Sequence, residues 1–255
     1  MSKERRTGLR ILVGAASFAD AVAGVRIVQK LPSSFCAGLG GLLVEEVDIL
    51  AACEIPDRRI VLSSGKTALA PNLSQLRTLL NADARAFRRL LAQASGPGAT
   101  QWAFMQDKGE LVSTALQAAT GWDVLVLGYR QTSKVLGKVI LLQKSGPPSE
   151  NVQEAFSRLS HRLAGEPIVF SIKENGDEAV SAQTSKTIQF KTLDDALRVL
   201  ARTNAQAVVV DFARGPIHNQ NDLLRLLEAA RCPVFVFDAS NPNSVLEHSM
   251  QIPPQ

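Results

Sequence analysis

Residues 109–130, GELVSTALQAATGWDVLVLGYR, form the stretch that decides the fold of this chain. The apolar spacing of its first half predicts an amphipathic helix, and the short apolar run 123–127 is typical of a buried parallel strand. In α/β proteins such a strand commonly presents a nucleotide at its carboxyl end. The glycine-rich loop that would hold the phosphates is missing, because the residues after Gly128 read YRQTSKVLGK. The stretch therefore predicts the scaffold of a nucleotide binder and the loss of most of its binding residues.

Upstream of this stretch, the sequence predicts three strands and two helices. Residues 9–14 form an apolar strand, and Ser17 is placed to cap the helix that follows. Residues 37–47 predict a second strand. A longer helix over about 72–95 carries apolar residues at helical spacing, and its leucines, Leu79 among them, are expected to face inward.

Downstream, strands and helices continue to alternate. The strand predicted at 101–105 lies just before the stretch. After it, the predicted strands cover 139–143, 168–172, 187–190, 207–212 and 234–237, and the predicted helices cover 150–163, 193–203 and 221–230. This alternation predicts a mostly parallel sheet covered by helices on both faces. A weak internal repeat matches DVLVLG at 123–128 with QAVVVD at 206–211, each after a helix rich in Ala and Leu. The fold class is therefore α/β, with two doubly wound units built on mostly parallel sheets.

Four segments follow from this organisation. Residues 1–8 are a short basic tail, residues 9–138 a first α/β domain and residues 139–239 a second one. Residues 240–255, which contain three prolines, form a tail.

Composition narrows the class of protein. The 255 residues are 45% hydrophobic with a net charge of +4, which predicts a globular chain with a substantial core. Lys and Arg are not gathered with aromatic residues, so we expect no nucleic-acid partner. The three cysteines, Cys36, Cys53 and Cys232, lie far apart, which fits a reducing compartment. With no signal peptide and no apolar run long enough to span a membrane, the sequence predicts a cytoplasmic protein.

Two glycine-containing patterns resemble phosphate-binding loops, but neither meets the requirements of such a loop. Residues 63–67 read SSGKT, but Ile60 stands where the first glycine of a Walker A loop belongs, in the least regular part of the first half. A polar turn is the better interpretation. Gly38, Gly40 and Gly41 precede the apolar core of their strand, whereas a dinucleotide loop follows a strand and opens a helix.

The chain resembles the universal stress protein family in a tandem, two-domain form. Four segments carry the resemblance: ILVGAAS at 11–17, GLLVEEVDILAACEIP at 41–56, WAFMQDKGELVSTALQAATGWDVLVLGYR at 102–130 and RCPVFVF at 231–237. The second of these is similar to a proteobacterial-type subgroup. The resemblance implies a three-layer sandwich of the adenine-nucleotide-binding type and a role in stress response or signalling.

The departures from the family pattern indicate a degenerate nucleotide site. ATP-binding members carry an aspartate at the end of the first strand, where this chain has Ala16, and a second loop glycine, where it has Gln131. In the second unit, Asp211 and Arg214 replace the first two glycines, and the carboxylate at 211 would repel a phosphate. The first unit also lacks the helix before its last strand. We therefore expect no ATP in the second unit and at most weak ATP or AMP in the first.

Five residues remain as candidate ligand contacts at the carboxyl edge of the first unit: Gly14, Ser17, Glu45, Gly128 and Arg130. Three of them also have a structural interpretation, with Ser17 as a helix cap, Glu45 as the polar exit of a strand and Arg130 as a surface residue.

No catalytic or metal-binding constellation is visible in the sequence. His161, His218 and His248 have no metal-ligand spacing, and Ser17 lies outside any nucleophile-elbow motif. Cys232 is expected to be a core residue. We therefore expect no catalytic residue, no bound metal and no required cofactor.

These observations predict a non-enzymatic, cytoplasmic protein of the universal-stress type with a regulatory or adaptor role. It would act on a protein partner that the sequence does not identify, as a homodimer or with its two units paired as an intramolecular pseudo-dimer. The alternative is a sensor that binds a nucleotide or another anion in the first domain. A third hypothesis, an enzyme of the wider adenine-nucleotide-binding group, requires an acid/base or nucleophilic constellation that the sequence does not show.

Overall fold

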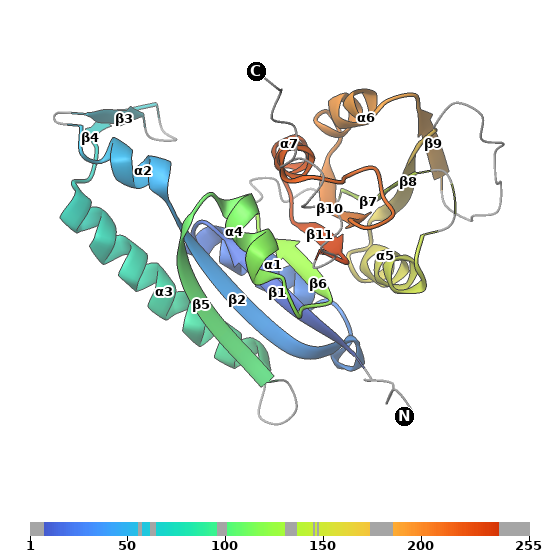
Figure 1. Ribbon diagram of the computed structural model, residues 1–255, viewed down its shortest axis with the longest axis horizontal. Helices are drawn as coiled ribbons and strands as arrows, with labels where there is room; N and C mark the ends of the chain where they lie inside the picture. Colours follow the sequence, from blue (N-terminus) through green and yellow to red (C-terminus); the bar gives the residue numbers. More distant parts are fainter. Residues whose placement is uncertain are drawn as a thin grey trace, which may run out of the picture.

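The computed structural model describes residues 8–55, 58–61, 65–95, 101–130, 137–144, 146, 148–173 and 186–239. The predicted tails 1–8 and 240–255 lie outside these residues except for Gly8. Nine strands form one sheet, in the order β5-β2-β1-β6-β11-β10-β7-β8-β9 (Figure 1). The strands are β1 (Leu9–Ala15), β2 (Cys36–Glu46), β5 (Gln101–Gly109), β6 (Val124–Leu127), β7 (Lys138–Lys144), β8 (Glu166–Ile172), β9 (Lys186–Phe190), β10 (Ala205–Asp211) and β11 (Val234–Phe237).

The direction of the strands divides this sheet into two blocks. Every neighbouring pair is parallel except β6 and β11, which run antiparallel, with Leu127 opposite Val234. Strands β5-β2-β1-β6 form the first block and β11-β10-β7-β8-β9 the second. The predicted α/β class with a mostly parallel sheet is confirmed, and its two blocks lie in one continuous sheet. The domain limits stay a prediction, and the limit between 138 and 139 falls at the start of β7, which belongs to the second block.

Helices cover both faces and complete a three-layer sandwich. The helices are α1 (Phe18–Val28), α2 (Val47–Ala52), α3 (Leu73–Ser95), α4 (Leu111–Ala118), α5 (Glu150–Arg162), α6 (Leu193–Leu200) and α7 (Gln220–Ala230), with a short 3₁₀ helix at Ser33–Phe35. Helices α1, α3 and α5 share one buried cluster with alternate strand residues, and α4, α6 and α7 share the other. Because successive side chains of a strand point to opposite faces, Val13 packs under α1 while Leu12 belongs to the opposite cluster.

The helix over 73–95 differs from its prediction in one respect. Its buried residues, Phe87 and Leu91 among them, all lie from the middle of the helix onward, whereas Leu79 is 56% exposed. Figure 1 shows the first turns of α3 projecting away from the sheet, at the end where the chain arrives from the small hairpin. The expectation that Leu79 faces inward was therefore wrong, because no strand lies under that part of the helix.

The segment 48–73, which gave the least regular pattern, contains α2 and a two-stranded antiparallel hairpin of β3 (Arg59–Val61) and β4 (Thr67–Leu69). Thr67 of the Walker-like sequence begins β4, so that sequence leads into a strand and not into a helix. Ser63 and Ser64 lie outside the described residues. None of the described helices is long and apolar enough to cross a membrane.

Candidate functional site

The five predicted ligand contacts belong to neighbouring elements at the carboxyl ends of β1, β2 and β6. Gly14 lies in β1 and Ser17 caps α1, where its hydroxyl accepts a hydrogen bond from the backbone N–H of Asp20 at 3.2 Å. Gly128 follows β6 and donates its N–H to the Gly14 carbonyl at 2.8 Å. The structure therefore connects Gly14 with Gly128 directly, and it confirms Ser17 as a helix cap.

The carboxylate of Asp20 occupies the centre of this edge. One of its oxygens accepts a hydrogen bond from the Ser17 hydroxyl at 2.5 Å, and the other accepts one from the backbone N–H of Arg130 at 2.7 Å. Asp20 thus joins the first turn of α1 to the loop after β6. Backbone amides of a helix N-terminus and of the loop after a strand are the groups that hold a phosphate in nucleotide-binding α/β proteins.

A second carboxylate binds the same helix end. Asp83 of α3 accepts a hydrogen bond from the backbone N–H of Phe18 at 3.0 Å. The positive end of the α1 dipole is therefore already paired with side chains of this chain. Sequence reasoning missed Asp83, because nothing in the local pattern of α3 shows that it reaches the start of α1.

Gly128 is required by packing. A Cβ atom at this position would lie 2.3 Å from the Asp20 carbonyl oxygen, which belongs to the first turn of α1. The helix and the loop therefore approach each other too closely to leave a cradle between them at this glycine. The motif glycine that the sequence retains serves this close contact.

The edge is also strongly negative. Burial raises the pKa of Glu46, and the nearby carboxylates of Asp20, Asp48 and Glu110 raise it further. Glu45 accepts a hydrogen bond from the Gln106 side chain at 2.6 Å. A polyphosphate would have to approach this group of carboxylates, which is unfavourable.

Arg130 bonds to this edge through its backbone N–H, which reaches Asp20. The residue is exposed and lines a groove along α1 together with Arg26 and Lys30. We call this the α1 groove; its wall is one face of α1, and Leu163, Gln206 and Pro233 of the second block line its other side. The sequence could not indicate it, because the groove requires residues from both blocks.

The corresponding edge of the second block is closed by Asp211. This residue ends β10, is 4% exposed, and accepts hydrogen bonds from the backbone N–H groups of Ala213 and Arg214 at 3.0 and 2.9 Å. A Cβ atom at Gly215 would lie 2.2 Å from the Asp211 carbonyl oxygen, so this loop folds tightly on itself. Burial raises the pKa of Asp238, at the end of the neighbouring strand, and the charge of Asp211 raises it further.

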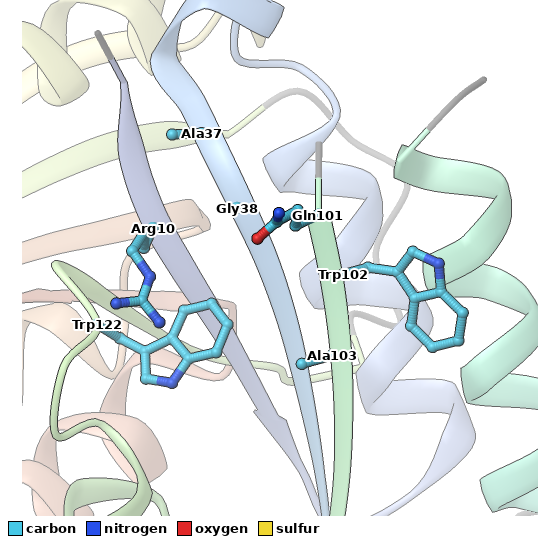
Figure 2. A pocket seen from close by; sticks show the side chains of 7 residues that line it. All are labelled: Arg10, Ala37, Gly38, Gln101, Trp102, Ala103 and Trp122. Carbon is cyan, nitrogen blue, oxygen red and sulfur yellow. The ribbon is translucent and has the colours of Figure 1, made fainter. Parts of the chain in front are cut away.

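A shallow groove lies at the opposite, amino end of the first block (Figure 2). The Arg10 guanidinium stacks 4.9 Å from the ring centroid of Trp122, beside the bare backbone of Gly38. A Cβ atom at Gly40 would come within 2.4 Å of the Trp122 ring, so the indole rests directly on β2. Figure 2 shows Trp102 on the far side of β5, away from this stack.

Within the described parts of the chain, the other chemical candidates from the sequence do not form a site. Among the described residues, no three His, Cys, Asp or Glu side chains are grouped as a metal site would require. Burial raises the pKa of the Cys232 thiol to about 12, so it stays protonated and unreactive in the core. His161 lies on α5, and His248 is outside the described residues.

Comparison of the structure with solved structures finds the same fold. A universal stress protein from Archaeoglobus fulgidus aligns over 91% of this chain and 97% of its own, with 10% sequence identity and a TM-score of 0.50. The predicted resemblance in fold is confirmed; at this identity the likeness concerns the fold alone.

Two other structures align with lower scores. The cytoplasmic domain of a prokaryotic cation chloride cotransporter has a TM-score of 0.37 at 10% identity, over 93% of this chain and 98% of its own. A functionally unknown protein from Pseudomonas aeruginosa has a TM-score of 0.43 at 13% identity, over 91% and 93%. No protein-family model matches the sequence, and no curated protein is significantly similar to it.

Proposed function

We propose that this protein is a non-enzymatic, cytoplasmic regulator or adaptor of the universal-stress type, which does not hold ATP and acts through protein contacts. One observation carries the proposal. The backbone N–H groups of Phe18 and Arg130, at the place where this fold would bind phosphate, are hydrogen bonded to the carboxylates of Asp83 and Asp20. An internal carboxylate at this place competes with any phosphate for the same donors.

The second block supports the proposal in the same way. The loop after β10 donates its N–H groups to Asp211, a buried carboxylate that would also repel a polyphosphate. Both edges therefore keep the arrangement of strand and helix. In each, carboxylates of the chain itself accept the hydrogen bonds that a phosphate would otherwise accept. At both edges the backbone N–H groups are already hydrogen bonded within the chain. This favours a role in which a partner protein recognises the surface of the molecule and not a bound nucleotide.

The antiparallel pair of β6 and β11 supports the proposal that the two units form a pseudo-dimer within one chain. Val126 lies opposite Phe235, and both are buried, so the sheet continues from one block into the other without an open edge.

The test is the nucleotide content of the purified protein. We expect protein isolated from a native-like host and then denatured to release no stoichiometric nucleotide. We also expect ATP, ADP and AMP to leave its melting temperature unchanged. A nucleotide that did bind would raise it, since a ligand at 100 times its Kd adds about 2.7 kcal/mol of stability. One nucleotide per chain would overturn the proposal and favour the sensor hypothesis. Loss of that nucleotide in Arg130→Ala, with wild-type stability, would then place its contact at this residue.

A further inference from the structure

The α1 groove runs between the two blocks on the face of the sheet that α1 and α5 cover. Its α1 wall comprises residues at positions 18, 19, 22, 23, 26 and 27, which form one continuous helical face, and Lys30 follows just after the helix. From residue 18 to residue 27 this face is about 14 Å long at 1.5 Å per residue. The opposite side is formed by Leu163 after α5 and by Pro233 before β11. The groove is therefore elongated and open, and both blocks contribute to it.

The middle of the α1 groove is apolar. Val22 and Ala23 of α1 are half-buried there, Ile27 lies at its base, and Leu163 and Pro233 face them from the second block. An apolar, solvent-facing groove along a helix is a common binding site for a second amphipathic helix.

Basic residues line the groove at both ends. Arg26 and Lys30 lie near the end of α1, and Arg130 lies near its beginning, where the carboxylates of Asp20 and Asp83 accept hydrogen bonds from backbone N–H groups. In the part of the chain that the structure describes, none of these three side chains forms an ion pair. From residue 20 to residue 30 the chain rises about 15 Å, so the charges flank the apolar middle.

We infer that the α1 groove binds an acidic amphipathic helix of a protein partner. The apolar side of that helix packs on Val22, Ala23 and Ile27, and its carboxylates meet the cations at both ends. A single-headed amphiphile such as a fatty acid would use the cations at one end alone, whereas a helix of about three turns uses both. This inference rests on the proposed adaptor function and names the kind of partner.

The experiment selects helices on the folded full-length protein. The probe is a phage-displayed library of 14-residue amphipathic helices, with apolar positions drawn from Leu, Ile, Met and Phe and rim positions drawn from Glu, Gln, Ser and Lys. We expect the selected clones to be enriched in Glu at the rim. We expect their affinity, measured with synthetic peptides by fluorescence polarisation, to fall at least tenfold for the double variant Arg26→Glu, Lys30→Glu.

A matched control changes the same net charge elsewhere. Arg77 and Arg85 are exposed on α3 and do not line the groove, so Arg77→Glu with Arg85→Glu should leave the affinity within twofold of wild type. Val22→Asp tests the apolar middle and should abolish binding. Circular dichroism verifies that each variant is folded.

Three outcomes would overturn the inference: no selected helix, selected helices without an acidic rim, or equal affinity for wild type and the groove double variant. Failure here is distinct from failure of the proposed function, which the nucleotide measurement tests separately. An empty protein that binds no such helix would keep the adaptor proposal and exclude this groove as its docking surface.

Discussion

Gly128 has no space for a methyl group, because a Cβ atom there would overlap the Asp20 carbonyl oxygen of α1. We expect Gly128→Ala to lower the free energy of unfolding by about 1–3 kcal/mol, since backbone atoms would have to move. Urea denaturation followed by circular dichroism measures the change. At Gly38 the nearest atom to a Cβ would be Arg10 Cγ at 3.5 Å, so Gly38→Ala serves as the control and should cost much less. Equal costs would contradict the close approach at Gly128.

Glu46 predicts a pH dependence of stability. Burial, followed by the charges of Asp20, Asp48 and Glu110, raises its pKa above the ordinary 4.5, so the folded protein holds this proton more tightly than the unfolded chain. The stability that protonation supplies is present below pH 4.5 and is lost as the pH rises through the raised pKa. We therefore expect Glu46→Gln to have a higher melting temperature than wild type at pH 7.

This advantage of Glu46→Gln should shrink at pH 4, where the wild-type carboxyl is mostly protonated in both states. Thermal melts of the two proteins at both pH values measure it. A variant that is less stable than wild type at pH 7 would show that the carboxylate is stabilised by its surroundings, against this prediction.

At the residue scale, local pattern could predict some contacts and not others. The position of Ser17 before an apolar helical face predicts a helix cap, and the structure confirms it. The contact of Asp83 with Phe18 joins residues 65 apart, and that of Asp20 with Arg130 joins residues 110 apart. Such contacts depend on how α1, α3 and β6 pack, and no local spacing records that packing.

The β3–β4 hairpin is an element that contributes little to the core. Val61 is 73% exposed and Leu69 is 70% exposed, so we expect Val61→Lys and Leu69→Lys each to change the free energy of unfolding by less than about 0.5 kcal/mol. Leu125 of β6 is completely buried, and Leu125→Ala should cost about 2–5 kcal/mol. Chemical denaturation of the three variants measures the contrast. A large loss at either hairpin position would show that the hairpin packs on the rest of the protein.

The same contrast explains which elements could be predicted. Strands such as β1, β6 and β10 are buried on both faces, so they read as continuous apolar runs between helices. The hairpin strands are three residues long and exposed, and they show no core pattern. The first half of α3 has no sheet beneath it, and for this reason the prediction that Leu79 faces inward is wrong.

The whole molecule should unfold as one unit. One buried cluster contains Leu12 and Leu125 of the first block together with Phe170 of the second. We expect Phe170→Ala to cost about 3–5 kcal/mol, and to lower the denaturation midpoint seen by tryptophan fluorescence as much as that seen by circular dichroism. The fluorescence reports the first block, because the two tryptophans, Trp102 and Trp122, lie in and beside its strands. An unchanged fluorescence midpoint would mean that the blocks unfold separately.

At this scale the sequence predicted two α/β units and could not predict how they join. Alternating strands and helices specify parallel neighbours within a unit through right-handed crossovers. The pairing of β6 with β11 brings together two four-residue apolar strands that are far apart in the chain. Nothing in the sequence of either strand indicates that they pair, or that they run antiparallel.

The position of β11 also has a consequence for the way the protein is made. The last strand of the described chain is inserted between β6 and β10, near the middle of the sheet. While the ribosome is still translating residues 138–233, the newly made first block exposes the whole hydrogen-bonding side of β6 to other nascent chains. A pause in translation before Val234–Phe237 would prolong that exposure, so the speed of synthesis over residues 138–237 bears directly on the yield of native protein.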